Sequence, residues 1–191
     1  NTAVAPDVMR MRLGGDCSAI TRPGQFVNIA LDGLYLRRPI SVCDCRGDEL
    51  TIIYKVVGHG TAQMSRMAPG ERLDILSGLG NGYDLSLSGE RPLLLGGGVI
   101  VTTVDGSYGV RGFVTDAMGS LDYTYFYTCG PEPMLRAVYG AARTEGELSF
   151  ERRMGCGFGA CMGCSCKTIT GNKRICREGP VMKRSDIIWE G

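Results

Sequence analysis

Alternating apolar and polar positions in the first half of the chain predict a series of short strands. Residues 8–13 alternate apolar and charged side chains, residues 25–31 form a second run after a Pro-Gly turn, and residues 50–57 are the most β-rich stretch. Turn residues separate these runs, which is typical of a small antiparallel barrel. One short helix is expected within it, over residues 61–67, beginning at a Gly-Thr cap and ending before a Pro-Gly pair.

The pattern changes after Pro92. Residues 92–95 are apolar without alternation, as in a strand buried on both faces of a parallel sheet. Glycines 96–98 follow, and such a turn normally opens a helix whose N-terminus receives a nucleotide phosphate. Instead, residues 99–104 form another strand pattern at once. Parallel neighbours need a crossover of about a dozen residues or more, so either a hairpin passes through the glycines or a segment is missing near residues 98–101.

Two helices and a strand are expected further on. Residues 112–118 favour a short helix, and residues 123–128 favour a strand that ends at Cys129. A helix follows with prolines at its start and an apolar stripe of Met134, Leu135, Val138 and Ala142. Cys129 could face a nicotinamide from the strand end, although buried packing is the commoner role of a free cysteine.

Cysteines and glycines are concentrated in residues 154–166. The spacing of Cys156, Cys161 and Cys164 is C-x4-C-x2-C, and a further cysteine, Cys176, follows. This is the ligand pattern of a plant-type [2Fe–2S] site. Glycines allow the positive φ angles and close amide approach that such a loop needs. Cys166 is expected to point to the opposite face and to pack. A structural zinc site is the alternative interpretation; disulfides are disfavoured because nine cysteines is an odd number and because no secretory or membrane segment is recognised, so a cytoplasmic location is expected.

Composition limits the other functions. The 191 residues are 43% hydrophobic and 21% charged, enough for a core shared by one to three small modules. A net charge of +1 gives no basic field for nucleic acid. The single histidine, His59, lies between glycines without an acidic neighbour, which disfavours a hydrolase triad.

Two corners of the predicted barrel could bind phosphate. Arg38 and Ser41 flank Pro39 at one corner, and a guanidinium binds phosphate oxygens in a bidentate manner. Residues 58–61, Gly-His-Gly-Thr, offer unobstructed backbone N–H groups at a helix start. Together they suggest the pyrophosphate of a dinucleotide such as FAD, while an ordinary surface arginine and a plain turn are the alternative interpretation.

These motifs together resemble the electron-transfer subunits of heterotetrameric, NAD-linked dihydroorotate dehydrogenase, in the ferredoxin reductase superfamily. The resemblance rests on Gly-Gln-Phe at 24–26, Arg-Pro-Ile-Ser at 38–41, Gly-His-Gly-Thr at 58–61, Gly-Asn-Gly at 80–82, Gly-Gly-Gly at 96–98, Asp-Gly-Ser-Tyr-Gly at 105–109, Cys-Gly-Pro-Glu-Pro-Met at 129–134 and the cysteine loop. It implies an antiparallel FAD-binding β-barrel over residues 1–90, a parallel α/β nicotinamide module over 91–147 and a [2Fe–2S] module over 148–191.

The resemblance also implies site residues. Those expected at FAD are Arg38, Pro39, Ile40, Ser41, Ile53, Tyr54 and Lys55, with Gly60 and Thr61 at its pyrophosphate. Those expected at NAD are Gly97, Gly98, Cys129 and Gly130, and the four cluster cysteines are Cys156, Cys161, Cys164 and Cys176. Many relatives carry an aromatic ring in place of Ile40, and no general acid or base is expected in the chain.

The implied activity is an electron relay. An FMN-containing catalytic subunit would oxidise dihydroorotate, and electrons would pass through the cluster and FAD to NAD+ in a complex of two copies of each subunit, with no nucleic acid or membrane involved. Superfamily members have a helix, a strand and a second helix after the glycine run. Their absence predicts a break near residues 98–101 or a natural deletion that impairs nicotinamide binding. The rival functions are a flavin and iron–sulfur subunit of a ferredoxin-dependent NADP reductase or sulfur-reducing hydrogenase, and a zinc-stabilised binding module.

Overall fold

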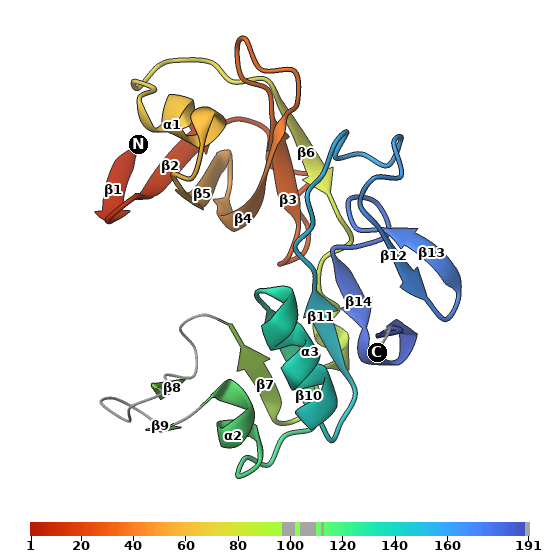
Figure 1. The fold of residues 1–191 in the computed structure, drawn as a ribbon. Coiled ribbons are helices and arrows are strands. Elements are labelled where there is room, and N and C mark those ends of the chain that lie inside the picture. Colours follow the sequence, from red (N-terminus) through yellow and green to blue (C-terminus); the bar gives the residue numbers. More distant parts are fainter. Residues whose placement is uncertain (97–101, 104–109, 112, 190–191) are drawn as a thin grey trace.

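The computed structural model describes residues 1–96, 102–103, 110–111 and 113–189. Its strands form two main sheets, one antiparallel and one mostly parallel, and a separate hairpin lies beside them (Figure 1). The predicted hairpin or break at residues 98–101 lies outside the described residues, as do Gly97 and Gly98. None of the helices within these ranges has the length and apolarity needed to cross a membrane.

The antiparallel sheet is built from the first eighty residues in the order β1-β2-β5-β4-β3-β6. Its strands are β1 (Thr2–Ala5), β2 (Val8–Gly14), β3 (Phe26–Ile29), β4 (Arg38–Arg46), β5 (Glu49–Lys55) and β6 (Ile75–Leu79). In β5, Leu50, Ile52 and Tyr54 are buried and alternate with more exposed residues, because successive side chains point to opposite faces. The antiparallel strands predicted from this alternation are therefore confirmed.

Helix α1 (His59–Ser65) begins two residues earlier than predicted. Its N-cap is Gly58, and Thr61 lies in the first turn rather than at the cap. The Thr61 hydroxyl oxygen accepts hydrogen bonds from the backbone N–H groups of Val57 (2.9 Å) and Gly58 (3.2 Å). The threonine thus caps the chain from inside the helix, as the acidic or amide residue of a capping box does, which explains the wrong boundary.

The second sheet has the order β14-β11-β10-β7. Strands β7 (Pro92–Leu95), β10 (Tyr125–Cys129) and β11 (Gly146–Ser149) are parallel, and β14 (Val181–Lys183) pairs antiparallel with β11. The described remainder of this region comprises η1 (Leu85–Leu87), β8 (Thr102–Thr103), β9 (Val110–Arg111), α2 (Val114–Met118) and α3 (Glu132–Ala141). The parallel sheet and its helices match the predicted α/β pattern.

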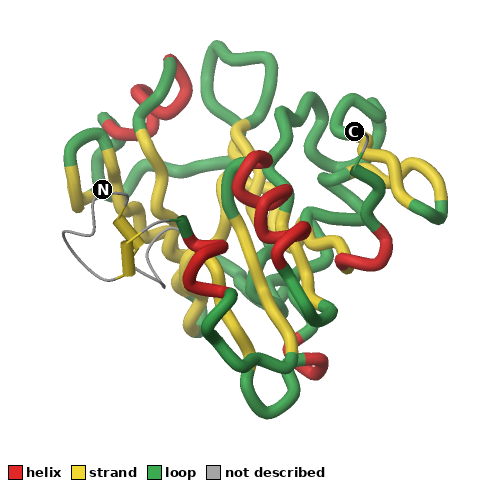
Figure 2. The backbone as a smooth tube through the Cα atoms, turned by 60° about the horizontal axis from the view of Figure 1, so that its bottom comes forward, coloured by secondary structure: helices red, strands yellow, loops and turns green. Residues whose placement is uncertain are grey.

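Helix α3 connects β10 to β11 and packs beside α2 on one face of this sheet (Figures 1 and 2). Its predicted apolar stripe is confirmed, since Leu135 and Val138 are fully buried. They belong to a core with Phe126, Leu148 and Met182. This core includes cysteines of the C-terminal region, so the parallel sheet and the cysteine loop share one hydrophobic interior.

The close pairing of β10 and β11 depends on Gly146. It lies opposite Phe126, and a Cβ atom at Gly146 would come within 2.3 Å of the Phe126 ring, which is fully buried. We expect Gly146→Ala to lower the free energy of unfolding by about 1–3 kcal/mol, as overpacking does. Denaturant unfolding would measure it. Gly140→Ala in α3 is the control, because its Cβ meets nothing within 4 Å and should be neutral or stabilising; equal stability of the two variants would contradict this packing.

Strand β11 carries a buried carboxylate, that of Glu147. The residue is 4% exposed, and one of its carboxylate oxygens accepts a hydrogen bond from the Asp84 backbone N–H at 2.9 Å. Burial raises its pKa above the usual range; the hydrogen bond from the Asp84 N–H opposes this shift, and the nearby charge of Asp84 reinforces it. The folded state therefore holds the Glu147 proton more tightly than the unfolded state does. The stability that this proton contributes is present below the pKa of the unfolded state and is lost as the pH rises through the pKa of the folded state.

We therefore expect the Glu147→Gln substitution to stabilise the folded chain more at neutral pH than at acidic pH. The glutamine can still accept the Asp84 hydrogen bond, but it has no charge to desolvate. Relative to the native chain, its free energy of unfolding should increase between pH 4.5 and pH 8, measured by denaturant titration at several pH values. A difference that does not change with pH would show that Glu147 has an ordinary pKa.

The C-terminal region comprises the cysteine loop and an antiparallel hairpin of β12 (Ser165–Thr168) and β13 (Gly171–Arg174). Strand β14 and η2 (Arg184–Asp186) follow and return the chain to the parallel sheet. The module division at residue 148 stays a prediction, and β11 continues across it. The cysteine loop is therefore held between the hairpin and both sheets.

Candidate functional site

One cavity of about 580 Å³ lies between the antiparallel sheet and the end of β11. It is lined by Phe26, Arg38, Pro39, Ile40, Ser41, Ile53, Tyr54, Lys55, Val57, Thr61, Cys129, Ser149, Phe150, Glu151, Arg152, Met154 and Pro180. Most of the cofactor residues predicted from the sequence therefore meet at one place. Gly60 and Gly130 do not line it, and Gly97 and Gly98 are not described. We call this space the interdomain cavity.

The two neighbouring arginines at the start of β4 have different roles. Arg37 forms a bidentate ion pair with Asp74, with nitrogen–oxygen distances of 2.6 and 3.1 Å, and so ties β4 to β6. Arg38 lines the interdomain cavity, and its guanidinium donates to the Leu36 carbonyl. Gly60 lies directly against it, because a Cβ atom there would come within 2.2 Å of the Arg38 Nε. A glycine at this position is thus required for Arg38 to lie at the start of α1.

The end of β5 contributes the floor of the cavity. Tyr54 is 4% exposed, packs in the core of the antiparallel sheet, and donates its hydroxyl hydrogen to the Asn1 side chain at 3.1 Å. Ile53 and Lys55 alternate with it and face the other way, and Ile53 is 43% exposed. The predicted contribution of Tyr54 can therefore come only from its backbone, whereas Ile53 and Lys55 present side chains.

The opposite wall includes Cys129 at the end of β10 and Ser149 beside it on β11. Surrounding protein desolvates the Cys129 thiol and Glu151 adds negative charge, and both raise its pKa, so it stays a neutral thiol near pH 7. Gly130 follows with a φ of 158°, and a Cβ there would come within 2.7 Å of the Met134 sulfur. Its function is to let the chain turn into α3.

Sequence reasoning missed the rest of this wall, namely Ser149 to Arg152, Met154 and Pro180. These residues end β11, follow it or precede β14, so their place in the cavity depends on pairing between distant strands. One local signal was available: the charged run Glu151-Arg152-Arg153 stands between a strand and the cysteine loop. Arg152 is oriented by an ion pair of 3.2 Å with Glu132 at the start of α3.

The cysteine loop needs glycine where it contacts the antiparallel sheet. Gly157 and Gly159 have φ angles of 76° and 95°, which favour glycine. The Asn28 amide of β3 donates to the Cys156 carbonyl at 3.0 Å, and a Cβ at Gly157 would come within 2.2 Å of that amide. Asn28, which is 1% exposed, thus fixes the start of the loop.

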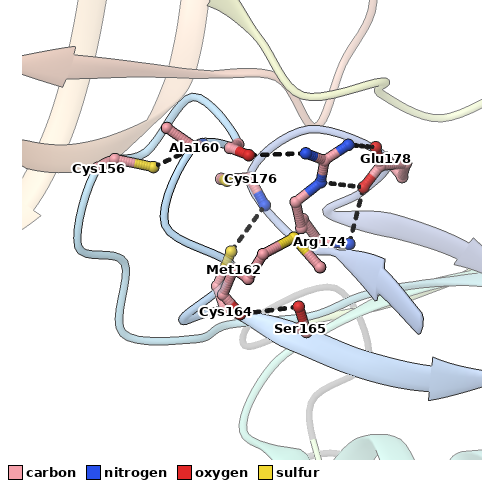
Figure 3. Close-up of polar contacts among 9 residues, drawn as sticks. Cys156, Ala160, Met162, Cys164, Ser165, Arg174, Cys176 and Glu178 are labelled. Carbon is pink, nitrogen blue, oxygen red and sulfur yellow. Dashed lines mark hydrogen bonds and ion pairs between the residues drawn. The ribbon is translucent and has the colours of Figure 1, made fainter.

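Backbone amides point at the sulfur of Cys156. The N–H of Ala160 donates to it at 3.2 Å (Figure 3), and the N–H of Cys161 donates to it at 3.4 Å. Burial raises the pKa of this thiol, but hydrogen bonds from Cys161, Phe158 and Ala160 outweigh it and lower the pKa to about 6. The loop therefore stabilises a thiolate, which is the form that binds a metal.

Cys164 and Cys176 form a second pair. They are 3% and 2% exposed, and the Cys176 N–H donates to the Cys164 sulfur at 3.4 Å (Figure 3). Within the described ranges no three cysteine, histidine or acidic side chains are gathered as for a single metal ion. One thiol pair lies on the loop and the other at the hairpin. This arrangement fits a binuclear cluster, in which each iron binds two thiolates, better than it fits a single zinc ion.

Cys166 is not part of either pair. It is partly buried and packs against the core of the parallel sheet, and burial raises the pKa of its thiol. The prediction that this cysteine packs rather than binds metal is consistent with its place on β12, two residues beyond Cys164. It supplies a matched control thiol for experiments on the cluster.

The residues present fit both groups that the sequence implies. Four thiols with amide donors suit an iron–sulfur cluster. Arg38, Lys55 and the start of α1 around Thr61 suit a pyrophosphate, in a cavity of the size that binds cofactors. Met154 and Pro180 line this cavity and lie close in sequence to Cys156 and Cys176. The candidate flavin site and the candidate cluster site are therefore neighbours.

Comparison with known proteins identifies relatives along the whole chain. Residues 151–188 match the family described as the iron-sulfur cluster binding domain of dihydroorotate dehydrogenase B. The electron transfer subunit of dihydroorotate dehydrogenase B (NAD(+)) from Fusobacterium nucleatum is 37% identical over 246 positions, with 98% of this chain and 95% of the relative covered. The subunit of the same name from Geobacillus sp. is 35% identical over 242 positions, covering 97% and 94%.

Solved structures agree on the fold. An NADH-dependent reduced ferredoxin-NADP oxidoreductase, studied for flavin-based electron bifurcation, has a TM-score of 0.82 at 24% identity and covers 98% of this chain and 87% of its own. A ferredoxin NADP+ reductase from Neisseria gonorrhoeae with bound FAD and NADP has a TM-score of 0.58 at 13% identity, covering 72% and 85%. The fold is that of ferredoxin reductases, and by its relatives the chain belongs to the family of electron-transfer subunits of NAD-linked dihydroorotate dehydrogenase B.

Proposed function

We propose that this chain transfers electrons from a catalytic dihydroorotate dehydrogenase subunit to NAD+, with FAD in the interdomain cavity and a [2Fe–2S] cluster at the two cysteine pairs. One observation carries the proposal: Met154 and Pro180 line the cavity while flanking the cysteine loop and Cys176. When bound, the cluster would carry single electrons, and FAD would exchange single electrons for the hydride that NAD+ takes.

The chain's own residues bind, orient and shield these groups. Arg38, Lys55 and Thr61 are assigned to the phosphates of FAD, with Gly60 allowing Arg38 to reach them. Ile40 and Ile53 offer apolar contacts, and Ile40 stands where an aromatic ring would stack in many relatives. Cys129 and Ser149 line the cavity wall that would face the nicotinamide, together with Glu151.

The relatives' names support a catalytic dihydroorotate dehydrogenase partner. We further propose that this partner carries FMN and that two copies of each subunit assemble, in the cytoplasm. The exposed side chains of Phe158 and Met162 on the cysteine loop, 53% and 50% accessible, are available for contact with it.

We also propose that the nicotinamide module of this sequence lacks a segment near Gly98. The alignment with the Fusobacterium nucleatum subunit runs over 246 positions, whereas this chain has 191 residues. One βαβ unit takes about thirty residues, so the difference accommodates the expected helix, strand and second helix. Peptide mass mapping of the protein isolated from its source tests this. A peptide in which Gly98 is followed directly by Val99 would instead indicate a natural deletion.

Co-purification tests the function. The chain should bind a flavoprotein partner, and the complex should reduce NAD+ when dihydroorotate is added. The purified chain alone should show flavin and iron–sulfur absorption bands. A colourless protein that contains zinc would refute the redox function. Reduction by ferredoxin in place of dihydroorotate would favour the ferredoxin-dependent reductase that the fold also allows.

A further inference from the structure

Arg174, at the end of β13, joins the two halves of the candidate cluster site. Its Nη1 donates to the Gly159 carbonyl at 2.7 Å, although the two residues belong to different segments (Figure 3). The loop before Gly159 carries Cys156, and the segment after Arg174 carries Cys176. The guanidinium therefore bridges from the hairpin to the cysteine loop.

The guanidinium is itself held by Glu178. The Arg174 Nε and backbone N–H both donate to one Glu178 carboxylate oxygen, at 2.9 and 2.8 Å, and an Nη2 contacts the other oxygen. The Arg174 and Glu178 side chains are only 22% and 33% accessible. A guanidinium held by Glu178 through Nε and Nη2 has little rotational freedom. It therefore presents its Nη1 group in a fixed direction.

Gly159 is confined from other sides as well. Its positive φ of 95° places its Cα against the stem of Arg177, where a Cβ would come within 2.7 Å of Cδ. Gly159 thus contacts the hairpin side twice, at Arg177 through its Cα and at Arg174 through its carbonyl.

We propose that Arg174 is a positioning residue, which holds the Gly159 peptide so that the Cys156–Cys161 pair faces the Cys164–Cys176 pair at the distance a binuclear cluster requires. This inference rests on the proposed function and deepens it. Arg174 acts on the thiolates through the Gly159 carbonyl and not by direct contact with a sulfur atom. Glu178 acts one step further away by orienting Arg174.

The test compares Arg174→Gln, Arg174→Lys and the native chain, each purified with its cofactors. Transfer of iron to a chelator, followed by loss of the cluster absorption, should be at least tenfold faster in Arg174→Gln. Arg174→Lys keeps the charge and can reach the Gly159 carbonyl but lacks the fork, so its rate should lie between the two. The electron paramagnetic resonance signal of the reduced cluster should broaden in the same order, because the thiolates are held less uniformly.

Arg153→Gln is the control for loss of a positive charge near the loop, since Arg153 is exposed and precedes the cysteine loop. It should keep the native chelation rate and spectrum. Equal rates and spectra for the native chain, Arg174→Gln and Arg174→Lys would overturn the inference, as would an equal effect of Arg153→Gln. A native chain without iron–sulfur absorption would instead refute the proposed function. If Arg174→Gln does not fold, Glu178→Gln, which loosens the fork and keeps the guanidinium, should still accelerate chelation relative to Arg153→Gln.

Discussion

Replacing Cys176 with serine is expected to abolish the iron–sulfur absorption of the purified chain while leaving its flavin bound. Cys176 is 2% exposed and pairs with Cys164, so no other thiol or water can easily take its place. Serine keeps the size of the side chain but is a far poorer ligand for iron than a thiolate. The interdomain cavity is lined by Pro180 rather than by Cys176, which is why the flavin should stay.

The measurement is the ratio of iron and acid-labile sulfide to flavin in the purified protein. For Cys176→Ser this ratio should fall close to zero at an unchanged flavin content. Cys166→Ser is the control, because Cys166 lies nearby on β12 and is partly buried against the same core but belongs to neither thiol pair. If Cys166→Ser loses the cluster and Cys176→Ser keeps it, the assignment of ligands is wrong. If flavin and iron are lost together, the two sites are not independent.

Substituting alanine for Gly60 should weaken FAD binding by about 10- to 100-fold. The new Cβ would overlap the Arg38 Nε, at 2.2 Å, and would push the guanidinium away from the start of α1. Hydrogen bonds to charged groups contribute about 1.5–3 kcal/mol each, and 1.4 kcal/mol corresponds to a tenfold change in affinity. Loss of the Arg38 contacts alone accounts for an effect of this size.

Quenching of flavin fluorescence during titration of the flavin-free chain would give the dissociation constants. Gly140→Ala in α3 is the control, because its Cβ would meet nothing within 4 Å and Gly140 does not line the cavity. It should bind FAD as the native chain does. Arg38→Gln should weaken binding to a similar degree, and adding Gly60→Ala to it should change little further. Native affinity in Gly60→Ala would show that Arg38 does not bind the phosphates.

The parts of the site that follow from local sequence were predictable. Residues 38–41 and 53–55 each form a continuous motif within one strand, and both line the same cavity. Alternation along β5 also indicates that Tyr54 faces the core when Ile53 and Lys55 face the cavity. The start of α1 was missed because a threonine inside the first turn takes over the usual task of the cap.

The remaining parts depend on contacts between segments far apart in the chain. Glu151 and Pro180 reach the cavity only because β14 pairs with β11, a register that no local pattern specifies. Arg174 has no motif at all, and its importance comes from a carbonyl fifteen residues earlier. The cysteine spacing predicted a binuclear site, whereas the grouping into one pair on the loop and one at the hairpin became visible only in the fold.

The late position of β14 in its sheet has a consequence for folding during synthesis on the ribosome. Strand β14 completes a sheet whose first strand in the chain, β7, begins at Pro92, so β7, β10 and β11 are all synthesised before it. Contacts of such wide sequence separation form slowly, and the open side of β11 stays exposed until they do. Iron and sulfide delivered before β14 is synthesised would meet an incomplete sheet, so cluster assembly is expected to follow the synthesis and pairing of β14.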